Sequence, residues 1–384
     1  MICETPPMGW NSWNTFGREI NEKMIKEMAD AMVDTGLLDC GYNYLVIDDC
    51  WAERQRDADG KLVPDRQKFP NGMKAVADYV HQKGLKFGIY SCAGMITCAG
   101  YPASFEHEFV DAQTFAQWGI DFLKYDYCFK PGSVSGDVLY KRMGAALANC
   151  GRDILFSACS CGKDETKKWI KTTGANMWRS TEDIYDTWTS LRELAMLADQ
   201  SIKYSGKNCF FDMDMLIVGM YGNGNVGLTG CTDTEYKTHF SLWALLGSPL
   251  MIGCDIRNMN DATKKILMNK DVIAINQDKA YNQPYSVAEP LSFSDDYKNE
   301  WPIYVKLLEN GDFAIGMFNF TDDPTNMYCC NLKLDLLGLS ESTGKTLLLT
   351  DLWNGEQTKV KNGLHIVEIA PHDCRLYRAK VVDR

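Results

Sequence analysis

The sequence lacks the features of several large classes of protein. It contains no apolar run of the roughly 18 residues that a membrane-spanning helix needs. Positive charge is in deficit, because 40 Lys and Arg stand against 51 Asp and Glu and give a net charge of −11. A nucleic-acid partner would require clustered cations to meet its phosphates. We therefore expect neither a membrane nor a nucleic acid as a partner.

Residues for metal and nucleotide chemistry are also scarce. The chain has five histidines, and none of them lies in an HxH or HExxH pattern. No serine occupies a GxSxG turn, and no glycine-rich loop indicates a nucleotide site. No CxxC motif pairs with another, so a structural metal is not predicted either. We expect the protein to use no metal and no cofactor.

The start of the chain has no recognisable leader. Residues 1–6 contain no basic segment followed by an apolar core, so we expect no signal peptide and a cytoplasmic location. A secreted mature chain restarted with Met would look the same. Cysteine is abundant, with 15 residues, and for a cytoplasmic protein we expect most of these thiols to be reduced.

What the sequence does contain is a regular alternation of strands and helices. Short apolar runs are each followed by a helical pattern, and eight such units precede residue 284. The expected strands lie at 8–13, 42–47, 85–90, 121–128, 154–158, 176–179, 209–213 and 249–252. This number and this length predict an α/β fold, a (β/α)8 barrel over residues 1–284.

After residue 278 the helical spacing disappears and short alternating runs take over. Turn dipeptides such as Asn310-Gly311 separate them. The expected strands lie at 303–308, 313–320, 327–332, 346–351, 364–369 and 374–377. We predict an antiparallel β-sandwich as a second domain over residues 285–384.

Polar and aromatic residues gather at one end of the predicted barrel strands. Near the carboxyl ends of these strands lie Trp13, Asp48, Asp49, Tyr90, Lys124, Asp126, Ser160, Arg179 and Asp214. In a (β/α)8 barrel this face carries the active site. A merely solvated surface would scatter such residues over both ends, so the sequence predicts a site here.

The fourth strand is the most informative of these, because an apolar run ends there in charge. Side chains alternate along a strand, so Lys124 and Asp126 leave it on the same side. A nearby ammonium favours the ionised carboxylate, which is the form that a carboxylate nucleophile requires. The alternative is a structural ion pair that only tethers the strand end.

Carboxylates surrounded by tryptophan and tyrosine are typical of a glycosidase active site. Two carboxyl groups catalyse glycosidic cleavage, while aromatic rings cover the apolar faces of a sugar. The residues alone therefore predict glycoside hydrolysis.

Several motifs in order then resemble one family. They are Met8-Gly-Trp-Asn-Ser-Trp13, Ile47-Asp-Asp-Cys-Trp51, Lys124-Tyr-Asp126, Trp178-Arg179 with Asp183, Asp212-Met-Asp-Met-Leu216 and Asp271-Val-Ile-Ala-Ile-Asn-Gln277. The chain closely resembles glycoside hydrolase family 27, the α-galactosidases and α-N-acetylgalactosaminidases, over essentially its whole length.

The resemblance implies an exo-acting, retaining mechanism in which Asp126 is the nucleophile and Asp183 the acid/base. Their carboxyl groups should lie roughly 5–6 Å apart, as retention requires. Because Asp183 would face a second carboxylate, we expect its pKa to be raised. The resemblance also implies a set of sugar-binding residues: Asp48 and Asp49 for the 4- and 6-hydroxyls, Trp13 and Trp51 as the aromatic wall, Tyr90 and Lys124 near the 3- and 4-hydroxyls, and Arg179 and Asp214 near the 2-position.

Two departures from the family pattern bear on these expectations. In secreted members the cysteine that matches Cys50 forms a disulfide, but residues 18–21 contain no cysteine that could pair with it, so Cys50 should be a free thiol. Cys98 and Cys128 match the disulfide that the family places beside the nucleophile. Ser160 replaces a glutamate of the family's 2-position pocket and would open room for an acetamido group. An α-galactosidase is therefore the first interpretation, and an α-N-acetylgalactosaminidase or a catalytically silent galactoside-binding protein are the alternatives.

Overall fold

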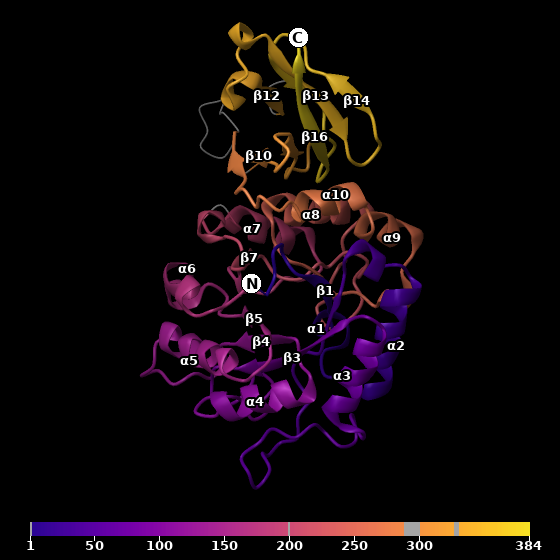
Figure 1. Ribbon diagram of the computed structural model, residues 1–384. Coiled ribbons are helices and arrows are strands. Elements are labelled where there is room, and N and C mark those ends of the chain that lie inside the picture. The colour runs from indigo at the N-terminus through magenta and orange to yellow at the C-terminus, as the bar shows by residue number, and fades with distance from the viewer. Residues whose placement is uncertain (1, 199, 288–299, 326–329) are drawn as a thin grey trace.

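The computed structural model describes residues 2–198, 200–287, 300–325 and 330–384, with a barrel below and a smaller β domain stacked on it (Figure 1). The barrel strands are β1 Met8–Asn11, β2 Tyr44–Val46, β3 Lys86–Cys92, β4 Phe122–Asp126, β5 Leu155–Ala158, β6 Met177–Arg179, β7 Phe210–Asp212 and β8 Leu250–Ile252. The α-helices are α1 Trp13–Phe16, α2 Glu22–Asp34, α3 Gly72–Gln82, α4 Glu108–Trp118, α5 Gly136–Ala148, α6 Thr166–Trp169, α7 Trp188–Ala198, α8 Asp233–Leu246, α9 Asp261–Leu267 and α10 Lys270–Asn276. Within the described part of the chain, none of the helices has the length and apolar character that crossing a bilayer demands.

The eight strands form one parallel sheet in the order β7-β6-β5-β4-β3-β2-β1-β8. The two ends of this order meet through Leu216, just after β7, which forms a parallel bridge with Ile252 of β8. The Leu216 N–H donates to the Met251 carbonyl at 2.7 Å, and the Gly253 N–H donates to the Leu216 carbonyl at 2.9 Å. The sheet thereby curls back on itself, and the predicted (β/α)8 barrel is confirmed.

Local sequence signals set the ends of the helices around the barrel. Helix α2 begins after Asn21, whose side chain accepts a hydrogen bond from the Met24 N–H at 3.0 Å. Helix α8 begins with a reciprocal capping box between Thr232 and Glu235, and it ends at Gly247 in the left-handed conformation. Both helices therefore begin at a polar residue whose side chain satisfies a backbone N–H group of the first turn.

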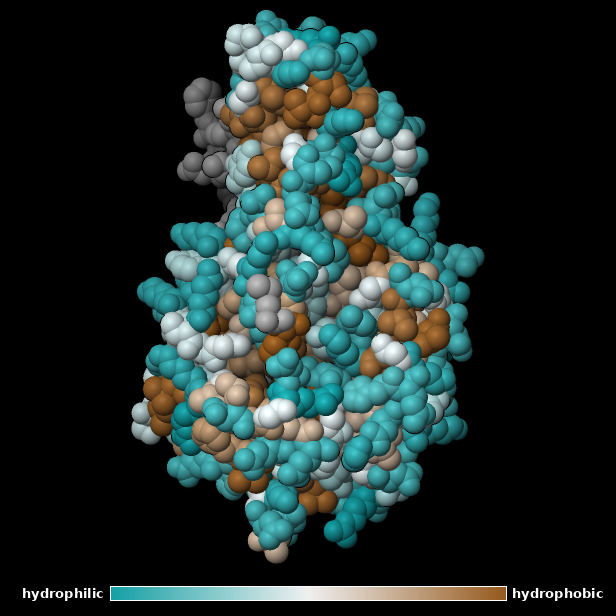
Figure 2. Space-filling model, in the orientation of Figure 1, coloured by the Kyte–Doolittle hydropathy of each residue, from teal (hydrophilic) through white to brown (hydrophobic). Residues whose placement is uncertain are grey.

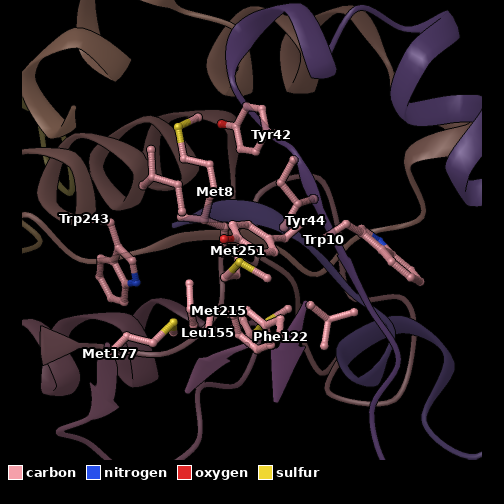
Figure 3. Packing of buried hydrophobic residues seen from close by; sticks show 14 of the residues in the cluster. Met8, Trp10, Tyr42, Tyr44, Phe122, Leu155, Met177, Met215, Trp243 and Met251 are labelled. Carbon is pink, nitrogen blue, oxygen red and sulfur yellow. The ribbon is translucent and has the colours of Figure 1, made fainter. Parts of the chain in front are cut away.

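Alternation along the strands decides what lies inside the barrel. Phe122 and Lys124 of β4, with Met177 and Arg179 of β6, line a small internal cavity of about 30 Å³. Figure 3 shows Phe122, Met177 and Met251 among the apolar side chains packed there. Strands β4 and β6 therefore each turn an apolar residue inward first and a charged residue two positions later, nearer the carboxyl end.

The C-terminal domain is built from antiparallel strands, as predicted. Its strands are β9 Tyr285–Ser286, β10 Ile303–Leu307, β11 Phe313–Phe318, β12 Asn331–Lys333, β13 Lys345–Asp351, β14 Gln357–Lys359, β15 Leu364–Ile366 and β16 Cys374–Asp383. Six form a sheet in the order β14-β13-β16-β11-β10-β9, and β12 pairs with β15 in a second sheet. Of the predicted strand at 327–332, residues 327–329 lie outside the described residues.

Helix α8 lies between the two domains and is buried on nearly every side (Figure 1). On the barrel side, the Trp243 indole N–H donates to the Asp214 carbonyl at 2.7 Å. On the other side, Ser241 accepts a hydrogen bond from the Trp353 indole at 3.0 Å. Lys306 of β10, also fully buried, donates to the Ile275 carbonyl of α10 at 2.9 Å, and burial lowers its pKa to about 8. Figure 2 shows a largely hydrophilic surface with a hydrophobic area on the upper, C-terminal domain. Besides its contacts with α8 and α10, this domain has an apolar core of its own that includes Val305, Ile315 and Leu347.

Candidate active site

A cavity of about 310 Å³ opens at the carboxyl ends of the barrel strands. Nine of the residues predicted from the sequence line it: Trp13, Asp48, Asp49, Tyr90, Lys124, Asp126, Arg179, Asp183 and Asp214. The predicted residues Trp51 and Ser160 do not line it.

Asp126 ends β4 and is held from two sides. Its Oδ2 accepts a hydrogen bond from the Tyr90 hydroxyl at 2.7 Å, and its Oδ1 accepts one from the Tyr127 backbone N–H at 2.7 Å. Burial raises the pKa of Asp126, and the charge of Lys124 with the Tyr90 hydrogen bond offset only part of that effect. Ionisation of this carboxyl group near neutral pH therefore depends on these neighbours.

Lys124 makes its direct ion pair with Asp48 rather than with Asp126. Its Nζ lies 2.7 Å from Asp48 Oδ2, which also accepts a hydrogen bond from the Asn11 amide at 2.9 Å. Asp49 is buried beside this pair and accepts from the Ala99 N–H at 3.0 Å. This end of the cavity is therefore lined by fixed charged groups that can receive the hydroxyls of a polar ligand.

Arg179 links two carboxylates on the other side of the cavity. Its Nη2 lies 2.9 Å from Asp183 Oδ1, and its Nη1 lies 2.8 Å from Asp214 Oδ1. The Arg179 side chain is 4% exposed, while that of Asp183 is 65% exposed. Asp214 is fixed further by the Ile184 N–H, which donates to its Oδ2 at 2.8 Å.

The prediction of a raised pKa for Asp183 is wrong. Burial of the carboxyl group does raise its pKa, but the charge and hydrogen bond of Arg179 outweigh burial, and the pKa lies below its ordinary value. The expectation considered only a facing carboxylate, whereas Arg179 pairs directly with Asp183 and also bridges it to Asp214. Arg179 therefore favours the ionised form of Asp183.

The two predicted residues outside the cavity have structural contacts instead. Trp51 is buried, donates its indole N–H to the Tyr90 carbonyl at 2.9 Å, and packs edge-on against Trp118. Ser160 is also buried, with its hydroxyl 2.5 Å from the Thr166 hydroxyl. The preceding residue, Cys159, does line the cavity.

A disulfide joins Cys98 and Cys128 next to the cavity, with their Cα atoms 5.3 Å apart. Cys98 Sγ lies 3.3 Å from Asp126 Oδ2. These two cysteines and Asp126 form the group of possible metal ligands among the described residues, but both sulfurs are used by the disulfide. Cys50 is free and buried, as the sequence predicted.

Some lining residues could not be identified from the sequence. Asn225 and Val226 come from the long loop between β7 and α8, where their N–H groups donate to Thr15 and Asn14 carbonyls at 3.1 Å. Gly224 has φ +87° and lies so close to Thr15 that a Cβ would fall 2.7 Å from its Cα. The run of glycines in this loop was the only available signal, and it does not indicate which loop it meets.

The arrangement combines two carboxylates with different surroundings in one cavity. Asp126 is partly buried and accepts two hydrogen bonds, whereas the Asp183 side chain is 65% exposed. Such a pair can supply a nucleophile and a proton donor across one bond.

Comparison with known proteins places the whole chain in one group. The family model described as "Alpha galactosidase A" matches residues 5–278, and that described as "Alpha galactosidase C-terminal beta sandwich domain" matches residues 298–379. An α-galactosidase of Cyamopsis tetragonoloba is 43% identical over 377 residues, which are 98% of this chain and 86% of the relative.

Solved structures give the same result. α-Galactosidase I of Mortierella vinacea superposes with a TM-score of 0.89 at 33% identity, covering 98% of this chain and 97% of that one. The α-galactosidase of Saccharomyces cerevisiae, solved with raffinose, superposes with a TM-score of 0.87 at 30% identity, covering 99% and 98%.

Proposed function

This chain belongs to glycoside hydrolase family 27, and we propose that it removes terminal α-linked galactose from oligosaccharides or glycoconjugates with retention of configuration. The observation that carries the proposal is the pair of unlike carboxylates in one cavity. Asp126 is partly buried and hydrogen bonded to Tyr90, and Asp183 stands at the more exposed side. The α-galactosidases of two fungi share the fold over nearly the whole chain.

The charged end of the cavity suits the hydroxyls of galactose. Asp48 and Asp49 are acceptors, and Lys124 is a donor whose charge is kept by Asp48 although burial opposes it. Trp13 lines the same cavity and offers an aromatic surface to the C–H bonds of the ring. We expect the sugar to enter with its 4- and 6-hydroxyls toward Asp48 and Asp49.

The first chemical step is attack by Asp126 on the anomeric carbon. The C–O bond to the leaving group breaks as Asp183 gives its proton to the leaving oxygen, so a glycosyl-enzyme ester and a free alcohol form. Asp183 then removes a proton from water, which attacks the same carbon, releases Asp126 and yields galactose with its original configuration.

These two reaction steps require Asp183 to be protonated when the substrate is bound. Arg179 holds the pKa of Asp183 below its ordinary value. A bound sugar covers the exposed side of this carboxyl group, and loss of water disfavours the ionised form. Substrate binding and proton uptake by Asp183 are therefore coupled.

The alternative preference for N-acetylgalactosamine depended on Ser160. Because that hydroxyl is buried against Thr166 and the residue does not line the cavity, its small size opens no room for an acetamido group. We therefore propose galactose as the sugar.

The test compares p-nitrophenyl α-galactoside with the matching α-N-acetylgalactosaminide, and it follows the configuration of the released sugar by NMR. We expect turnover of the galactoside, α-galactose as the first product, and no turnover by Asp126→Ala. Asp78→Ala is the matched control, because Asp78 is a surface residue of α3 paired with Lys74. A correctly folded wild-type protein that hydrolyses no α-galactoside would refute the proposal.

A further inference from the structure

Three large apolar side chains stand exposed beside the mouth of the cavity. Met95 is 63% exposed, Ile96 is 39% exposed and Phe129 is 61% exposed. We call these three residues the apolar ledge. Single exposed apolar residues are ordinary, but a group of them on neighbouring loops marks a binding surface.

Backbone contacts place the apolar ledge next to the nucleophile. The Met95 N–H donates to the Phe129 carbonyl at 3.3 Å, so the loop after β3 and the loop after β4 lie against each other here. The Cys98–Cys128 disulfide joins the same two loops. Cys98 lines the cavity and lies 3.3 Å from Asp126, so the loop that carries Met95 and Ile96 also contributes to the cavity wall.

The ledge is held in a defined position. A Cβ at Gly94 would lie 1.9 Å from the Cys128 carbonyl oxygen, which shows how closely the two loops approach. Phe129 has φ +48°, a left-handed conformation that a bulky residue adopts only against a steric cost. The surrounding contacts keep this conformation, and the ring stays in solvent rather than folding into the core.

A further exposed ring lies at the cavity. Tyr185 lines it, is 47% exposed, and follows Asp183 by two residues on the loop after β6. The leaving group must lie near Tyr185, because Asp183, two residues away, protonates the leaving oxygen in the proposed mechanism.

We propose that the apolar ledge is an aglycone subsite, and that it favours α-galactosides whose aglycone is an alkyl or aryl group over those whose aglycone is a second sugar. The inference rests on the proposed function and adds the chemical class of the substrate. The ledge side chains offer no strong hydrogen-bond donor or acceptor to sugar hydroxyls. They do offer apolar area that an alkyl or aryl group removes from water.

The test uses substrates that share the galactosyl group and differ in the aglycone. α-Galactosyl fluoride has no aglycone body, methyl and octyl α-galactoside differ only in the alkyl chain, and raffinose carries sugars. Octyl α-galactoside is used below its critical micelle concentration. The measured quantity is kcat/KM for each, and the octyl-to-methyl ratio isolates binding of the apolar chain.

The variants are Met95→Asn and Phe129→Asn, since asparagine is polar and also tolerates the left-handed conformation at position 129. Leu197→Asn is the control. Leu197 is 45% exposed near the end of α7, which runs back to the opposite face of the barrel.

We expect a wild-type octyl-to-methyl ratio of about tenfold or more, falling toward one in both ledge variants and unchanged in the control. Activity on α-galactosyl fluoride should stay at the wild-type level in all of them. A wild-type ratio near one, or an equal loss on raffinose and octyl α-galactoside, would overturn the inference. Failure of the wild type to hydrolyse α-galactosyl fluoride would instead overturn the proposed function itself.

Discussion

Replacing Tyr90 by phenylalanine removes one oxygen atom and with it the hydrogen bond to Asp126. The Tyr90 hydroxyl lies 2.7 Å from Asp126 Oδ2. A hydrogen bond to a charged group contributes about 1.5–3 kcal/mol, and most of it is present only while Asp126 is ionised. Since burial already raises the pKa of Asp126, the variant loses one of the groups that oppose this effect.

The expected result is a change in the pH dependence of kcat/KM. A nucleophilic carboxylate must be ionised, so the rate falls as pH decreases through the pKa of Asp126 in the free enzyme. Tyr90→Phe raises that pKa further and moves the acidic limb to higher pH. At a pH on the acidic side of both limbs, kcat/KM should fall about 10- to 100-fold, because about 1.4 kcal/mol corresponds to a factor of ten.

The assay is hydrolysis of p-nitrophenyl α-galactoside in stopped samples from pH 3 to pH 9. Tyr79→Phe is the control, because it removes a tyrosine–aspartate hydrogen bond to Asp30 on the surface. A uniform loss at every pH, with the limb unmoved, would show that Tyr90 only positions the sugar and that the reasoning is incorrect.

Three further changes test other parts of the structure. Asp183→Asn should reduce kcat/KM for methyl α-galactoside far more than for p-nitrophenyl α-galactoside, because only the poor leaving group needs a proton; equal losses would argue for a positioning role. Replacing Cys98 and Cys128 together by alanine should lower the free energy of unfolding by about 2–4 kcal/mol in urea titrations, and an unchanged midpoint would contradict this. Burial lowers the pKa of Lys306 to about 8, so the unfolded chain binds more protons than the folded one above that pH. The wild type should therefore gain stability relative to Lys306→Met as pH rises from about 8 to about 10, and parallel pH profiles of the two proteins would refute that assignment.

The sequence predicted the parts of the site that depend on strand geometry. Lys124 and Asp126 are two residues apart at the end of an apolar run, and period-two alternation alone puts both on the inner side of the barrel. The starts of helices are local in the same sense, because the side chain that caps α2 belongs to Asn21, three residues before the N–H group that it accepts from.

The parts that failed depend on side-chain directions beyond the strand ends. Ser160 lies just after β5, where the chain turns, and its hydroxyl forms a hydrogen bond with the hydroxyl of Thr166, six residues later. The lowered pKa of Asp183 depends on Arg179 reaching it across four residues of non-helical chain. The direction of neither side chain can be predicted from sequence periodicity, because the loops that follow the strands have no regular repeat.

Asn225 illustrates a different limit. It reaches the cavity because its loop pairs with residues near the start of the chain, about 210 positions away. Composition and periodicity describe neighbours in sequence, so they could not predict this contact.

Helix α8 has a consequence for how this protein can be divided. It carries the Trp243 hydrogen bond to the backbone of Asp214 on one side and the Trp353 contact of the second domain on the other. The sandwich is thus joined to the barrel through α8, which contacts the cavity residue Asp214, and also through α10, whose Ile275 carbonyl accepts the hydrogen bond of Lys306. The barrel is therefore not expected to be independent of the sandwich. A barrel produced without the sandwich would expose the side of α8 that Trp353 contacts, and the same helix carries the Trp243 hydrogen bond to the backbone of Asp214.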